Sequence, residues 1–142
     1  MLLHPTIESL KALRLFGMVK ALEEQQQSTQ WNDLVFEERL GLLVDRERVE
    51  QENRSLTARL RRARLGQQAT IEDLDLNTRR GLDRSLIASL STCNWIRAHH
   101  NVLITGPTGV GKGYLACALG QRSCREGLSV LYHRLGRLFA EL

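Results

Sequence analysis

A glycine-rich run that ends in a lysine, at residues 106–112, carries the clearest chemistry in this sequence. It reads Gly-Pro-Thr-Gly-Val-Gly-Lys and fits the P-loop pattern G-x-x-x-x-G-K. Glycine adopts backbone angles that other residues disfavour, so successive N–H groups can point at one phosphate. A helix beginning at Lys112 would add the positive end of its dipole and a full charge. The predicted nucleotide-binding residues are Gly106, Pro107, Thr108, Gly109, Val110, Gly111, Lys112 and Gly113.

Gly113 departs from the pattern, because a serine or threonine normally follows the lysine and places its hydroxyl on Mg²⁺. Glycine has no side chain for a metal, so we expect ATP to bind with Mg²⁺ held less well. No apolar run ending in paired acids follows Tyr132, where a P-loop ATPase would hold Mg²⁺ and activate water. The sequence therefore predicts nucleotide binding without turnover, no catalytic residue in this chain and no metal site of its own.

Two other interpretations of the glycine-rich run stay open. A dinucleotide fingerprint, G-x-G-x-x-G, would start at Gly109, but its third glycine is replaced by Tyr114. A tight turn between a strand and a helix would also use glycines and would need no ligand.

A cluster of arginines is the second candidate site. The chain has a net charge of +4, and residues 54–64 contain five arginines and no acid. Such a surface attracts the phosphates of DNA without regard to sequence. A solvated helix end, favoured by the helix dipole, would explain part of the cluster with no ligand. The candidate DNA-binding residues are Arg54, Arg59, Arg61, Arg62 and Arg64.

The elements that must position these residues follow from the spacing of apolar side chains. Helices are predicted over residues 5–26, from Asn32 or Asp33 to about 65, and from Asp83 to about 100, with Gly66 ending the second. Short apolar runs at 102–105 and 129–132 predict buried parallel strands. Between them a helix should start near Lys112 and stop before Gly127, and another helix begins near residue 137.

These elements indicate an α/β fold, in which an N-terminal helical domain precedes a truncated P-loop domain built on a parallel sheet. The predicted domains are a helical N-terminal domain at 1–66, a connector and helix at 67–100, and the truncated ATP-binding domain at 101–142. Two strands cannot cover both faces of such a sheet, so self-association is expected.

Composition bounds the cellular setting. The three cysteines, Cys93, Cys117 and Cys124, form no C-x-x-C pair, which favours free thiols over a disulfide framework or a zinc site. No basic, apolar leader opens the sequence, and no apolar stretch approaches the ~18 residues of a membrane span. We expect a soluble, cytoplasmic protein that does not enter a membrane.

The glycine-rich run and its flanks resemble the IstB-type transposition helper ATPases, relatives of the DnaC helicase loader in the AAA+ class. The similarity covers essentially the whole chain. It rests on residues 101–112 and 115–120, the run Gly-Leu-Asp-Arg at 81–84, residues 129–132, and the helical region with 52–54 and 59–64.

The resemblance implies an AAA+-like P-loop NTPase that is oligomeric, binds ATP and DNA, and helps a transposase engage its target. Only residues 106–112 carry over as nucleotide-binding positions, since the family's metal-binding hydroxyl falls on Gly113. Its acidic strand and later motifs would lie beyond Leu142, so the chain resembles an amino-terminal part. The alternative is a non-enzymatic helical interaction fragment whose vestigial P-loop no longer binds nucleotide.

Overall fold

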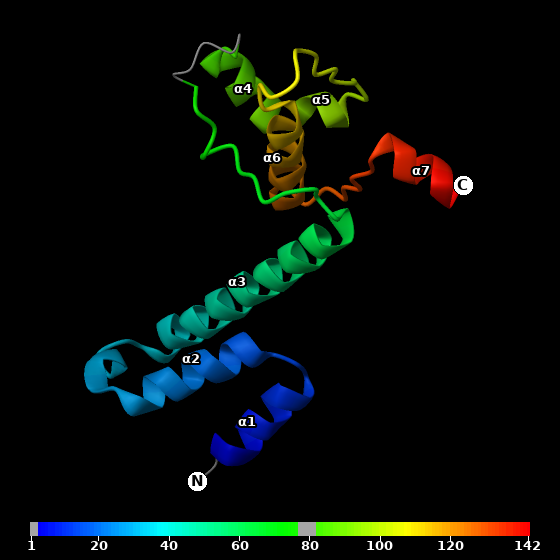
Figure 1. Cartoon of the computed structure of the whole chain (residues 1–142). Helices are drawn as coiled ribbons and strands as arrows, with labels where there is room; N and C mark the ends of the chain where they lie inside the picture. Colours follow the sequence, from blue (N-terminus) through cyan, green and yellow to red (C-terminus); the bar gives the residue numbers. More distant parts are fainter. Residues whose placement is uncertain (1–2, 77–81) are drawn as a thin grey trace. The chain divides into compact units, whose positions relative to one another are not determined.

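The computed structural model describes residues 3–76 and 82–142, which form two compact units, Met1–Ser55 and Leu56–Leu142. Figure 1 shows the helices along the chain. The long helix α3 (Phe36–Ala63) runs through the boundary between the units. Gly81, part of the run at 81–84 that resembles the IstB-type proteins, lies outside the described residues, as does the segment 77–81 of the predicted connector.

The first unit contains α1 (Leu3–Ala12), α2 (Phe16–Gln27), the short 3-10 helix η1 (Thr29–Trp31) and the beginning of α3. One helix was predicted over 5–26, but the helix is interrupted between α1 and α2, where Arg14 takes a positive φ of 61°. The start of α2 is held by Glu47 of α3, whose carboxylate accepts N–H groups from Gly17 (2.6 Å) and Met18 (3.2 Å).

The helix α3 is shorter at both ends than its apolar pattern predicts. It begins at Phe36 rather than at Asn32 or Asp33, because η1 and a turn occupy the residues before it. It ends at Ala63 rather than at Gly66, because the next residue, Arg64, has a positive φ of 52°. Gly66 serves a different purpose, since a Cβ there would lie 3.0 Å from the ring of Tyr132.

The second unit places α6 (Lys112–Arg125) against α4 (Arg84–Ser91), with α5 (Asn94–Arg97) and α7 (Leu135–Glu141) following in the chain. Leu115 and Leu119 of α6 are buried against Ile87 of α4, and Cys117 and Ala118 are buried against the connector. The predicted helix from Asp83 is interrupted at Cys93, which has a φ of 61°. The helix starts at Asp83 as predicted, and Asp83 is its N-cap, because its carboxylate accepts the N–H of Ser85 at 3.1 Å.

The predicted parallel sheet is absent from the described residues, which form helices and loops only, so the α/β fold with a parallel-sheet P-loop domain is wrong. Residues 102–105 and 129–132 form no regular secondary structure, and neither run is paired with a strand in the described part of the chain. Tyr132 instead donates its N–H to the carbonyl of Ala63 at the end of α3, at 2.8 Å. Apolar content alone does not make a strand, because the backbone hydrogen bonds of a sheet also need a neighbouring strand.

The side chains of the run at 102–105 differ in how far they are buried. Ile104 packs on the cluster formed by Ile87, Leu115 and Leu119, whereas Leu103 is 90% exposed.

The domain boundaries after residues 66 and 100 divide the chain by expected function and stay a prediction.

Candidate nucleotide-binding site

The glycine-rich loop enters α6 through residues whose backbone only glycine adopts readily. Gly106, Gly109 and Gly111 have φ angles of 155°, 87° and 97°, all positive. Gly111 is the N-cap of α6, so Lys112 is the first residue of a 14-residue helix. The sequence pattern placed the loop and the helix start correctly, because glycine and the capping position leave a strong local signal.

The backbone N–H groups of this loop have no acceptor within the described part of the protein. Apart from Pro107, which has no N–H, residues 106–112 could each donate one hydrogen bond, yet none makes a hydrogen bond of normal length and angle to a protein oxygen, although a turn forms at 108–109. The first bond at the start of α6 runs from the N–H of Leu115 to the carbonyl of Gly111. The free donors lie on an exposed loop, where an anion could accept them.

Lys112 crosses the loop and donates from its ammonium Nζ to the carbonyl oxygen of Gly106. The positive charge therefore lies at the exposed carbonyl of Gly106, where the glycine-rich loop begins. Pro107, Thr108 and Val110 are exposed, and the loop requires nothing of their side chains.

The loop is supported from below by packed apolar residues. Ile104, before the loop, and Leu115, in the first turns of α6, belong to one cluster with Ile87 and Leu119. This packing holds the two ends of the loop while Gly106 and Gly109 stay exposed.

Gly113 lies in the first turn of α6 and is exposed. A Cβ built there would meet only Nε2 of Gln67, at 3.6 Å, an ordinary contact. The position therefore has room for a side chain, and the missing hydroxyl is a matter of residue type rather than of space. The sequence gives no sign that Gln67 lies here, because nothing in its spacing connects it with the loop.

The five candidate DNA-binding arginines divide into two groups. Arg54 pairs with the buried Glu47 at 3.3 Å, and Nε of Arg59 donates to the carbonyl of Cys124 at 2.9 Å. Both contacts hold the fold together. Arg61, Arg62 and Arg64 are exposed and make no ion pair within the described residues.

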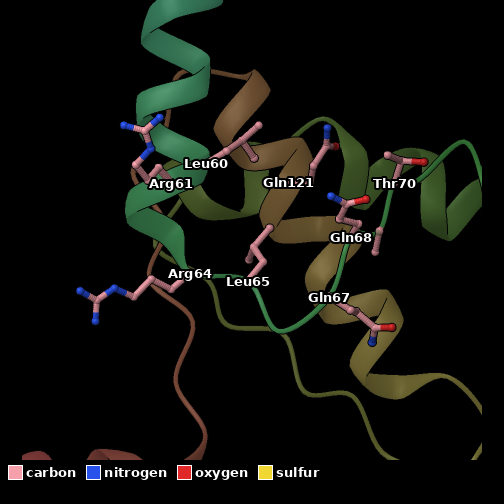
Figure 2. Close-up of a pocket in the computed structure, with 9 residues that line it drawn as sticks. Leu60, Arg61, Arg64, Leu65, Gln67, Gln68, Thr70 and Gln121 are labelled. Atoms are coloured by element: carbon pink, nitrogen blue, oxygen red, sulfur yellow. The ribbon is translucent and has the colours of Figure 1, made fainter.

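Two hollows adjoin the end of α3 in the second unit. A cavity of about 640 Å³ is lined by Leu60, Leu65, Gln67, Gln68, Thr70 and Gln121, with Arg61 and Arg64 at its edge. Figure 2 shows both arginines directing their guanidinium groups away from Gln68 and Gln121.

The other hollow, of about 320 Å³, is lined by basic side chains from two distant segments. Its lining includes Arg64, His133, Arg134, Arg137 and Glu141. The hydrogen bond from Tyr132 to Ala63 brings the two segments together. Arg134 and Arg137 were not singled out from the sequence, because they lie about 70 residues beyond Arg64 and only the fold brings them near it.

Comparison with known proteins places the chain in a class of ATP-binding proteins. Residues 8–142 match the family model of the IstB-like ATP binding proteins, and the chain belongs to that family. Relatives that align with most of the chain are named as ATP-binding proteins of insertion sequences.

A putative insertion sequence ATP-binding protein of Sinorhizobium fredii, y4pL, is 49% identical over 142 residues. The putative ATP-binding protein of insertion sequence IS1162 from Pseudomonas fluorescens is 48% identical over 143 residues, and that of IS21 from Pseudomonas aeruginosa is 33% identical over 140. The first two alignments take in 100% of this chain but 58% and 62% of the relatives, and the third takes in 99% and 52%. The chain thus spans about 60% or less of their length.

Among the described residues, every helix is too short or too polar to span a membrane.

Proposed function

We propose that this chain binds the phosphates of ATP at residues 106–112, and that it does so as a helper of insertion-sequence transposition. The observation that carries the proposal is the set of free N–H groups at residues 106–112, together with the contact between the ammonium of Lys112 and the carbonyl of Gly106 in the same loop. Membership of the IstB-like family and the names of the insertion-sequence relatives support the same ligand.

Each part of the loop has a physical role in this proposal. The positive φ angles of Gly106, Gly109 and Gly111 are of the kind that lets N–H groups of a loop turn toward one ligand, where they would donate to phosphate oxygens. The N-terminus of α6 adds its dipole to the same point, and Lys112 balances the charge of the outer phosphates. Mg²⁺ would come with the nucleotide, and Gly113 offers it no ligand.

Replacing the lysine tests the proposal directly. We expect Lys112→Ala to weaken the binding of a fluorescent ATP analogue about 10- to 100-fold, since a charged hydrogen bond contributes roughly 1.5–3 kcal/mol. The measurement is a fluorescence titration of the whole chain with and without Mg²⁺.

Lys11→Ala is the matched control, because Lys11 is a half-exposed lysine on α1. Equal affinities of the Lys112→Ala and Lys11→Ala chains, or no saturable binding by the unchanged chain, would rule the proposal out. The second result would favour a helical interaction protein with a vestigial loop.

DNA contact is the second part of the proposal, and the basic hollow favours it. The guanidinium groups of Arg61, Arg62 and Arg64 are exposed at the end of α3. Arg64 also lines one hollow with Arg134 and Arg137. Within the described residues none of these five arginines makes an ion pair, so each stays available to a phosphate. Arg54 and Arg59 have structural partners and contribute less. The family resemblance adds a transposase as a partner of the same complex.

Salt dependence tests the DNA contact. We expect the double change Arg61→Ala and Arg64→Ala to lower the slope of log affinity against log salt by about one per lost phosphate contact. The measurement is fluorescence anisotropy of a labelled DNA duplex at several NaCl concentrations.

Arg48→Ala serves as the control, because Arg48 is 67% exposed on α3 and pairs with Asp45. Slopes that do not differ between the double variant and this control would contradict the assignment, whatever the result of the ATP titration.

A further inference from the structure

A side-chain amide lies at the one position where the P-loop pattern is incomplete. The nearest atom to the Cβ that Gly113 lacks is Nε2 of Gln67, at 3.6 Å. Figure 2 shows Gln67 beside the first turn of α6, on the side where the glycine-rich loop joins the helix. The residue comes from the connector after α3, some 46 positions earlier in the chain.

Packing on both sides of Gln67 fixes its place. Leu65 lies against Gly120 so closely that a Cβ there would come within 2.9 Å of its side chain. Ala69 is buried against Cys117 and Ala118 of α6, and the N–H of Thr70 faces the hydroxyl of Tyr114 at 3.5 Å. The connector is thus packed against α6 on both sides of Gln67, which keeps the backbone of Gln67 near the start of that helix.

The amide of Gln67 is available for a ligand. Within the described residues its side chain makes no hydrogen bond, and the residue is exposed. Rotation about its last side-chain bond exchanges the oxygen and the nitrogen, because no protein partner holds either one. An amide carbonyl oxygen is a hard donor, of the kind that suits Mg²⁺.

We propose that Gln67 helps to bind the Mg²⁺ of bound ATP, because its side-chain carbonyl oxygen supplies the ligand that Gly113 lacks. This inference rests on the proposed function, since the ion enters with the nucleotide. It also explains how an exposed polar side chain and a glycine at adjacent places can together replace one hydroxyl.

The test compares nucleotide affinity in Mg²⁺ and in EDTA for the whole chain. We expect Gln67→Ala to lower the affinity for the fluorescent ATP analogue in Mg²⁺ on the order of tenfold and to leave the affinity in EDTA unchanged. Gln68→Ala is the matched control, because Gln68 lines the same cavity from the same connector.

A rescue completes the experiment. Gly113→Thr restores a hydroxyl, and the 3.6 Å contact leaves space for its Cβ. We expect Gly113→Thr to raise affinity in Mg²⁺ and to make Gln67→Ala nearly silent in the double variant, a non-additive pair.

The outcomes separate this inference from the proposed function. If Lys112→Ala abolishes binding but Gln67→Ala matches Gln68→Ala, or weakens binding equally in EDTA, the role of Gln67 is overturned and the nucleotide site stands. Additive effects of Gln67→Ala and Gly113→Thr would also overturn it. If the unchanged chain binds no nucleotide under either condition, both proposals fail together.

Discussion

Glu47 shows how a single acid can organise a helical unit. It is only 5% exposed, and its carboxylate accepts the N–H groups of Gly17 and Met18 at the start of α2. Gln51 and Arg54 donate to its other oxygen at 3.1 and 3.3 Å. An acid at a helix N-terminus satisfies orphan donors and the helix dipole at once. Arg54, a candidate DNA-binding residue from the sequence, therefore has a partner within the protein.

We expect Glu47→Ala to lower the free energy of unfolding by about 2–3 kcal/mol, because it leaves two buried or half-buried donors of α2 without an acceptor. Urea unfolding followed by far-ultraviolet circular dichroism measures the change. Glu52→Ala, which removes an exposed acid from the same helix, is the control. Equal midpoints for the two variants would show that the cap contributes nothing.

At the scale of elements, local signals predicted more than long-range ones. The glycines of the loop, the start of α6 and the start of α4 at Asp83 were all visible, because each depends on a few neighbouring residues. The break at Arg14 was missed, since arginine gives no sign of a positive φ. The strands were predicted wrongly, because an apolar run does not reveal whether a partner strand exists. Gln67 and the basic hollow depend on contacts across the chain, which no local pattern contains.

The connector between α3 and α4 is joined to α6 by an ion pair that should respond to pH. Arg125 donates to both carboxylate oxygens of Glu72, at 2.8 and 3.0 Å. The hydrogen bond from Arg125 is the main cause that lowers the pKa of Glu72 below its ordinary value of 4.5. A carboxyl whose folded pKa is lowered stabilises the protein above its unfolded pKa and loses this contribution as pH falls through the folded pKa.

We therefore expect Glu72→Gln to reduce thermal stability slightly near neutral pH, within the ~0.2–1 kcal/mol of an exposed ion pair. The difference from the unchanged chain should shrink as the pH is lowered below 4.5. Melting temperatures between pH 7 and pH 3 measure it. Asp73→Asn is the neighbouring control, because Asp73 pairs with no arginine in the described part of the chain. A difference that is constant with pH, or equal for both variants, would contradict the role of this pair.

At the scale of the whole molecule, the chain consists of two units that carry different chemistry. The first unit, Met1–Ser55, is built around Glu47, and the second, Leu56–Leu142, contains the glycine-rich loop and the basic hollow. The second unit also exposes large apolar side chains, including Leu131, Leu135 and Phe139, each more than 60% exposed. This surface supports the self-association expected from the sequence, which stays a proposal.

The contact between Lys112 and the carbonyl of Gly106 has a consequence for how tightly any polyanion could be held. The ammonium of Lys112 already has an acceptor. On binding, a phosphate oxygen would therefore replace the carbonyl oxygen of Gly106 as its hydrogen-bond partner. The gain from the lysine is the difference between the two attractions, and the released carbonyl must turn to water. In return, the side chain starts in place and loses little rotational freedom when the ligand arrives.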